Sequence, residues 1–345
     1  MKIDKLLLLL CFLPLSLYAQ TPQNIYEEAC RSMDSMLSGK APLDFKKAIL
    51  LTENAYWEKT LDMEDFDRYL QLYAAICRGI ISSGNIIYKE SDAEKAVAQC
   101  AVFLFMTDST PVTVENNVVS VPPFEYNFDD FAGQKEWSST FVSTLLQTGK
   151  GNCHSLPYLY KLLMNELGHD AFLSLAPSHL YIKAYNKQVG WYNIELTCGD
   201  FPTDAWIMSS GYIHIDALRN GLYMDTLSLK QSIVLCLTDL ARGYYAKFGL
   251  EDGRLILKCC ENALEYFPHY INALLLKAEI LLKLEQQVAG NAKNDSQTVL
   301  LRDLYSYIHR LGYRQMPVEM YLRRIRTKGM QTTDYRVKSL LIPTE

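Results

Sequence analysis

The chain has 345 residues, of which 49% are hydrophobic and 21% charged, and its formal net charge is −5. This composition is typical of a globular protein long enough for two or three domains, and it excludes a disordered or fibrous chain. Because a mildly acidic chain binds nucleic acid and anionic membranes poorly, we expect neither partner.

The first nineteen residues read MKIDKLLLLLCFLPLSLYA, with two lysines before an apolar run from Leu6 to Leu13 and a small residue at Ala19. This pattern predicts a secretory signal peptide cleaved after Ala19, and hence an exported protein, periplasmic or extracellular. The run is shorter than the roughly 20 residues that span a bilayer, so no membrane span is expected. The alternative is a lipoprotein signal acylated on Cys11, but Leu10 stands where such signals carry a small residue.

From residue 20 to residue 107 the apolar spacing is helical, and it predicts an N-terminal helical region. The segment DMEDFDRYLQLYAAICRGII, for example, places Phe66, Leu70, Ala74 and Cys77 on one face. Residues 108–133 hold prolines, polar clusters and β-branched residues, which indicates a loop or a short-strand connector.

Residues 108–224 are expected to form a central α+β unit. GNCHSLPYLYKLL opens a helix that ends before Gly168, and AFLSLA, HLYIKAY and GWYNIEL read as three short strands. A turn over 186–190 joins the last two strands. The prediction is a mostly helical chain whose centre is a helix packed on a small antiparallel sheet.

Residues 225–345 return to a helical pattern and predict helical hairpins. Ala263, Pro268, Ala273 and Ala278 resemble the small-residue and closing-proline positions of a tetratricopeptide repeat. A plain helical bundle is the alternative. In either form this region offers a surface for a protein partner.

Eight cysteines follow the predicted signal peptide, and most of them fit a buried role. Those that fall inside helical apolar patterns, where a cysteine is usually a small buried hydrophobe, are Cys30, Cys77, Cys100, Cys236, Cys259 and Cys260. No cysteine pair has zinc-finger spacing, so we expect neither a metal nor a cofactor.

Cys153 stands apart because it lies at a helix start, after Gly149 and Gly151. Unpaired N–H groups and the positive end of the helix dipole favour the thiolate there. The glycines allow the backbone to approach closely. This setting predicts a nucleophilic thiol, with the next residue, His154, facing elsewhere.

A histidine and a glutamate share one face of the two paired strands. The even positions of the two strands, within 180–184 and 192–196, are apolar, whereas His179 and Glu195 occupy odd positions on the face turned away from the core. If Tyr185 pairs with Trp191, Glu195 lies diagonal to His179, about 7–8 Å away at the backbone. A glutamate side chain can span that distance to an imidazole.

These residues resemble the core of the transglutaminase-like superfamily, which is related to papain-type cysteine proteases. Its motif has a glycine-x-cysteine opening a helix, a histidine starting a strand, and an acid before a threonine at the end of the next strand. Cys153, His179 and Glu195 match these three points, although the superfamily usually has aspartate at the third.

The resemblance implies a cysteine hydrolase or acyl transferase that acts on amide bonds of peptides or proteins. The oxyanion donor would be the Cys153 N–H with Trp137 or Gln147, and Tyr181, Trp191 and Asn193 would line the substrate groove.

Three alternatives stay open. The chain could be an inert binding module that recognises a peptide or a partner protein with its groove and helical repeats. Cys153, His179 and Cys198 could hold a metal, or Cys153 and Cys198 could form a disulfide.

Overall fold

The computed structural model describes residues 22–288, 295–317 and 319–320. Helices account for 57% of the residues and strands for 12%, which confirms a mostly helical α+β chain. The predicted signal peptide and the end of the C-terminal region, residues 321–345, lie outside the described residues. Among the helices that are described, none combines the length and the apolar character needed to cross a bilayer.

The N-terminal region is helical, as predicted. Its helices are α1 (Pro22–Leu37), α2 (Phe45–Tyr56), α3 (Met63–Ser82) and α4 (Ala93–Thr107). Helix α3 buries Phe66, Leu70, Ala74 and Cys77, the face that the apolar spacing predicts.

The connector is mainly extended. Strands β1 (Thr110–Val114) and β2 (Asn117–Val121) form an antiparallel hairpin whose two turn residues both have positive φ, as tight hairpin turns require. Strand β3 (Glu125–Tyr126) runs parallel to β4 (Lys150–Gly151). In the sequence between these two strands lie the 3-10 helix η1 (Trp137–Thr140) and helix α5 (Val142–Thr148).

The centre of the molecule is one helix on a three-stranded antiparallel sheet. Helix α6 (Ser155–Glu166) packs on the sheet of β5 (Phe172–Ala176), β6 (His179–Asn186) and β7 (Gly190–Ile194), in the order β5-β6-β7. Tyr185 pairs with Trp191, which confirms the predicted register. Leu180, Ile182, Ala184, Tyr192 and Ile194 are buried on the core face.

The opposite face of the sheet is covered, which corrects the expectation of a face turned away from the core. The segment after β7 holds α7 (Asp204–Ser210) and α8 (Ile215–Arg219) and returns across the sheet. Tyr181 and Asn193 on that face are buried, and along the open edge of β5 the N–H groups of Met224 and Leu227 donate to the carbonyls of Leu175 and Leu173. Parity in a strand fixes which residues share a face, but not what packs on it.

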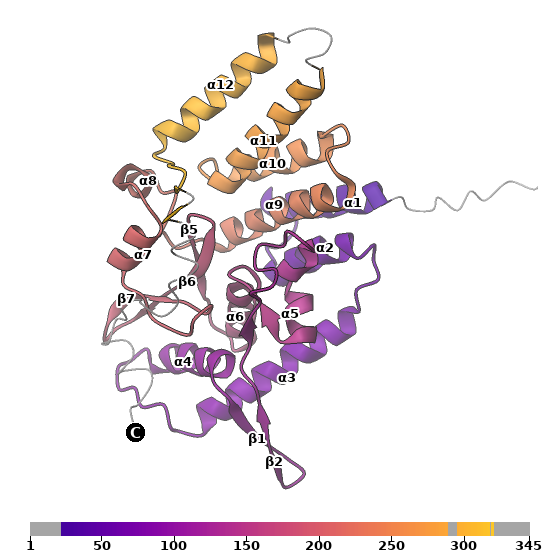
Figure 1. The fold of residues 1–345 in the computed structure, drawn as a ribbon. Coiled ribbons are helices and arrows are strands. Elements are labelled where there is room, and N and C mark those ends of the chain that lie inside the picture. The colour runs from indigo at the N-terminus through magenta and orange to yellow at the C-terminus, as the bar shows by residue number, and fades with distance from the viewer. Residues whose placement is uncertain (1–21, 289–294, 318, 321–345) are drawn as a thin grey trace, which may run out of the picture.

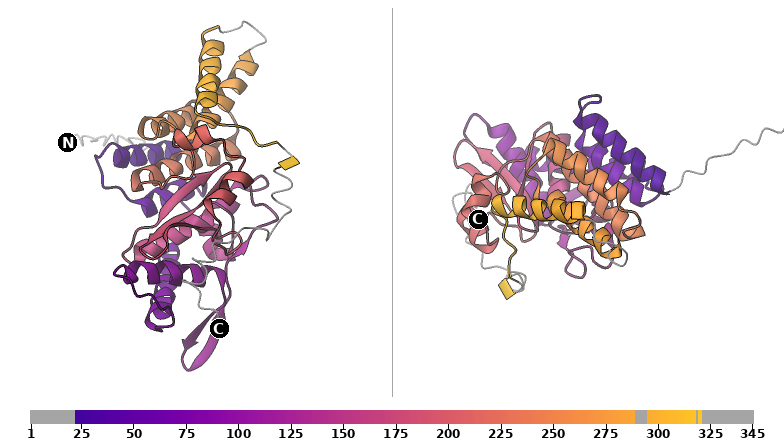
Figure 2. Two further views of the ribbon diagram at one scale, coloured as in Figure 1. Left: turned by 90° about the vertical axis from the view of Figure 1, so that its left-hand side faces the viewer. Right: turned by 90° about the horizontal axis from the view of Figure 1, so that it is seen from above.

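The C-terminal helices stack in sequence order, each against the next. They are α9 (Leu229–Phe248), α10 (Arg254–Tyr266), α11 (Ile271–Val288) and α12 (Asp295–Arg310). Ala263, Ala273 and Ala278 are buried on α10 and α11. Helices α1 and α2 pack on α9, so these two helices and the C-terminal helices form one layer above the sheet (Figure 1; Figure 2).

A buried carboxylate joins this layer to the central unit. The two carboxylate oxygens of Glu53 on α2 accept from the N–H groups of Val142, at 2.7 Å, and Ser143, at 2.9 Å. These are unpaired donors at the start of α5. Burial raises the pKa of Glu53 to about 7. The side chain thus positions α5 and, through it, the segment that leads to Cys153.

Replacing Glu53 with alanine is expected to lower the free energy of unfolding by about 2–4 kcal/mol, because two buried N–H groups lose their acceptor. Urea denaturation measures this, with the exposed Glu64→Ala on α3 as a control that should change stability by less than about 0.5 kcal/mol.

The raised pKa of Glu53 also predicts how the stability of the fold depends on pH. An acid whose pKa is higher in the fold than in the unfolded chain stabilises the fold below its unfolded value, here 4.5, and this contribution is lost as pH rises through about 7. The stability advantage of the natural protein over Glu53→Gln should therefore shrink from pH 5 to pH 8. An advantage that grows over this range would contradict the assignment.

Candidate active site

Cys153 lies in a turn that leads directly into α6. The side-chain oxygen of Asn152 accepts from the N–H groups of His154, at 2.9 Å, and Ser155, at 3.0 Å, and its carbonyl accepts from Leu156. Asn152 therefore caps the helix. Among the described residues no acceptor faces the N–H of Cys153, so this donor is available at the cysteine.

Two glycines bring the chain into this turn for different reasons. Gly149 has φ of 70°, a left-handed conformation that ends α5. A Cβ at Gly151 would lie 2.8 Å from the hydroxyl oxygen of Ser155 and 2.9 Å from a methyl of Leu145. Only a glycine lets the strand before Cys153 pass this close to α6.

His179 joins Cys153 to Glu195. The imidazole Nε2 lies 2.5 Å from Oε2 of Glu195, and Cys153 is close enough to the same ring for the two groups to shift each other's ionisation. Since Nε2 is taken by the carboxylate, Nδ1 is the ring nitrogen left for the thiol. The structure thus brings together the three residues that the sequence selects, in the order thiol, imidazole, carboxylate.

The carboxylate is held on both oxygens. Oε1 of Glu195 accepts from the N–H of Thr197, at 3.0 Å, and from its hydroxyl, at 2.7 Å. Although burial opposes ionisation, His179 and Thr197 lower the pKa of Glu195 below its usual value. The extra methylene of glutamate, compared with aspartate, lets the side chain reach the ring from a diagonal position.

The thiol and the imidazole shift each other's ionisation. Burial opposes both charges, but Glu195 and the thiol raise the pKa of His179, and His179 lowers the pKa of Cys153. Both shifts favour an imidazolium paired with a thiolate, which is the state in which a cysteine is nucleophilic.

The triad opens onto a cleft of about 170 Å³ between the sheet and the C-terminal helices. One wall carries Cys153, His179 and Trp137, together with residues of β5 and β6. The other comes from α9 and the start of α11 and consists of Leu235, Thr238, Asp239, Arg242, Tyr270 and Asn272. The helical region thus supplies half of the site.

Only one of the two side-chain oxyanion candidates reaches the cleft. Trp137 lines it, and its buried indole Nε1 has no hydrogen-bond partner in the part of the chain that the structure describes. Gln147 is exposed, because Leu145 and Leu146 take the inward face of α5. The expectation for Gln147 is wrong, whereas Trp137 lines the same cleft as Cys153 and has an unpaired indole donor.

The predicted groove residues do not line the cleft. Tyr181 and Asn193 are 1% and 2% exposed, because the segment after β7 covers them and Asn193 donates to the carbonyl of Pro202. Trp191 is 52% exposed, but it packs against Tyr185 at the far end of the hairpin. Assigning these residues to a substrate groove is therefore a mistake.

His154 also differs from the expectation that it faces elsewhere. It lines the cleft, and its Nε2 lies 3.0 Å from Oδ2 of Asp239 on α9. Sequence reasoning missed Asp239, which is 86 residues further along the chain than Cys153. The only signal in the sequence is a carboxylate within the otherwise apolar stretch SIVLCLTDLA.

Neither the metal nor the disulfide alternative finds support. Within the described ranges no group of three or more His, Cys, Asp or Glu side chains is arranged to hold a metal ion. All eight described cysteines, including Cys153 and Cys198, are free of disulfide bonds.

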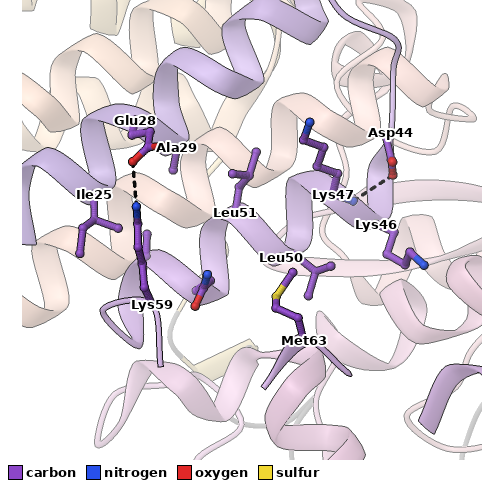
Figure 3. Close-up of a pocket in the computed structure, with 12 residues that line it drawn as sticks. Ile25, Glu28, Ala29, Asp44, Lys46, Lys47, Leu50, Leu51, Lys59 and Met63 are labelled. Atoms are coloured by element: carbon purple, nitrogen blue, oxygen red, sulfur yellow. Dashed lines mark hydrogen bonds and ion pairs between the residues drawn. The ribbon is translucent and has the colours of Figure 1, made fainter. Parts of the chain in front are cut away.

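A larger hollow, of about 490 Å³, lies between α1 and α2, away from the triad (Figure 3). Its walls are mostly aliphatic, and two of its lysines are paired, Lys59 with Glu28 and Lys46 with Asp67. It contains no nucleophile with an adjacent base, so it does not compete with the cleft as a catalytic site.

Comparison of the chain with protein-family models, with curated proteins and with solved structures finds no match.

Proposed function

We propose that the chain is an exported cysteine-dependent hydrolase or acyl transferase that acts on amide bonds of peptides or proteins. The observation that carries the proposal is a cleft wall with Cys153 and His179 on it, in which Glu195 is hydrogen-bonded to His179 and the thiol and the imidazole shift each other's ionisation. The similarity of these residues to the transglutaminase-like motif supports the same reaction class. The stacked C-terminal helices are compatible with a tetratricopeptide-like region that binds a protein partner.

In the proposed reaction the Cys153 thiolate attacks the amide carbon, and a C–S bond forms. The Cys153 N–H and the Trp137 indole N–H stabilise the oxyanion. The C–N bond then breaks as His179 gives its proton to the leaving amine. Water or a second amine attacks the thioester, His179 takes up the proton of this nucleophile, and the released thiolate completes the cycle.

Iodoacetamide labelling of the purified protein across pH tests the first requirement. The labelling rate of Cys153 should report a thiol pKa well below the ordinary value of about 8.5. An ordinary value would favour the inert binding module, in which Cys153→Ala would leave peptide or partner binding intact.

Acyl transfer itself can be detected without knowing the natural substrate. Incubation with activated esters of N-acyl amino acids should produce a thioester on Cys153 that mass spectrometry detects, with none in Cys153→Ala. Adding a primary amine then separates the two reactions, since a transferase yields an amide and a hydrolase yields the free acid. Equal modification of both proteins would reject the proposal.

Trp137→Phe tests the oxyanion role. This change keeps the ring packing and removes the N–H, so a peptide aldehyde that forms a hemithioacetal with Cys153 should bind roughly 100-fold more weakly. The iodoacetamide rate should not change, because alkylation builds no oxyanion. Unchanged aldehyde affinity would remove Trp137 from the mechanism.

A further inference from the structure

A second imidazole–carboxylate pair lies in the same cleft as the triad. His154 Nε2 is 3.0 Å from Oδ2 of Asp239, and the hydroxyl of Tyr158 donates to the same oxygen at 2.9 Å. The rings of His154 and Tyr158 pack at 4.3 Å between centroids. The side chains of His154 and Asp239 are only 27% and 15% exposed, so little water screens the pair.

The two members of this pair come from the two walls of the cleft. His154 directly follows Cys153 in the turn before α6, whereas Asp239 projects from α9. A buried carboxylate that accepts two hydrogen bonds needs a positive partner, and a protonated His154 satisfies it. His154 and Cys153 line the same cleft, and the positive charge on His154 favours the Cys153 thiolate.

The charged groups near His154 come from several elements. Glu53 on α2 adds negative charge as it ionises and so also favours the imidazolium, whereas Arg242 on α9, which lines the same cleft, carries a positive charge. The other titratable groups near His154 and Asp239 are Cys153, Tyr158, Cys236, Tyr270 and His179. Asp239 is the group in direct hydrogen-bond contact with the ring.

We propose that Asp239 holds His154 in its protonated form, and that this second imidazolium stabilises the Cys153 thiolate; the inference rests on the proposed function of the same site. The proton that leaves the thiol goes to Nδ1 of His179, and His154 keeps its own proton throughout. His154 and Asp239 are therefore positioning residues that act through charge. Because Asp239 belongs to α9, the reactivity of the thiol depends on the docking of the helical layer.

The test compares iodoacetamide labelling of Cys153 from pH 4 to pH 10 in the full chain, in Asp239→Asn, in His154→Asn and in the double variant. Each single change should move the labelling midpoint upward by about one pH unit, which is about a tenfold slower reaction at pH 6. The double variant should behave like either single variant, because the two residues act as one pair. Glu261→Gln, which removes a carboxylate of α10 outside the cleft, should leave the midpoint unchanged.

Two results would overturn the inference while leaving the proposed function intact: a low midpoint in the natural protein that neither variant moves, or additive shifts in the double variant. A high midpoint in the natural protein would instead reject the proposed function itself. If Asp239→Asn does not fold, nuclear magnetic resonance of the imidazole of His154 in the natural protein decides the matter. Its titration midpoint should lie above the usual 6.5, and a midpoint at or below that value would refute the inference.

Discussion

His179→Ala is expected to return Cys153 to the reactivity of an ordinary or a buried thiol. The imidazole of His179 lowers the pKa of Cys153 more than His154 does, against the opposing effect of burial. Without it, the thiol pKa should rise to about 8.5 or higher, and alkylation by iodoacetamide at pH 6 should slow roughly 100-fold or more. At a pH above the midpoint of the variant, where its thiol is ionised as well, the rates of the two proteins should converge.

If the two rates converge at high pH, the His179→Ala substitution has removed the base. If they stay apart, it has changed the access of iodoacetamide to Cys153. His214→Ala provides the matched control, because this exposed histidine caps α8 outside the cleft. Its labelling profile should superimpose on that of the natural protein. If His179→Ala also superimposes, His179 does not set the ionisation of Cys153, and the triad fails as a chemical unit.

The sequence predicts the triad because each of its constraints is local. Cys153 is fixed by the turn that begins a helix, and alternation along a strand places His179 and Glu195 on one face. A short turn joins β6 to β7, and the pairing of Tyr185 with Trp191 then determines the register of the two strands. A register shifted by one residue would turn the Glu195 side chain into the core.

The rest of the site depends on packing between distant segments. Asp239 reaches His154 only because α9 lies across the sheet, and Tyr181 and Asn193 are buried only because the chain after β7 returns over them. An amphipathic pattern indicates that one face of a helix packs against another element, but it does not identify that element. The prediction that Gln147 is an oxyanion donor is wrong for a related reason, since the spacing to Cys153 does not reveal which face of α5 turns inward.

Glu195→Gln is expected to reduce thiolate formation by removing the negative charge that stabilises the His179 imidazolium. Gln keeps the length and one acceptor oxygen for Nε2, but its NH₂ group then meets the N–H of Thr197 or the ring. The thiol midpoint should rise, and labelling at pH 6 should slow about 10- to 100-fold, less than in His179→Ala because the ring remains. Glu195→Asp tests separately whether the side chain must be long enough to reach His179, because it keeps the charge but shortens the side chain by one methylene.

The pair should also contribute to stability over a defined pH range. The lowered pKa of Glu195 stabilises the fold above the unfolded value of 4.5, and this contribution is lost as pH falls through the folded value. The raised pKa of His179 stabilises the fold below its unfolded value of 6.5 and is lost as pH rises through the folded value. The stability lost in Glu195→Gln should therefore be greatest between about pH 4.5 and 6.5. A loss that does not vary with pH would mean that Glu195 acts only as a hydrogen-bond acceptor, with no ionic pair to tune the thiol.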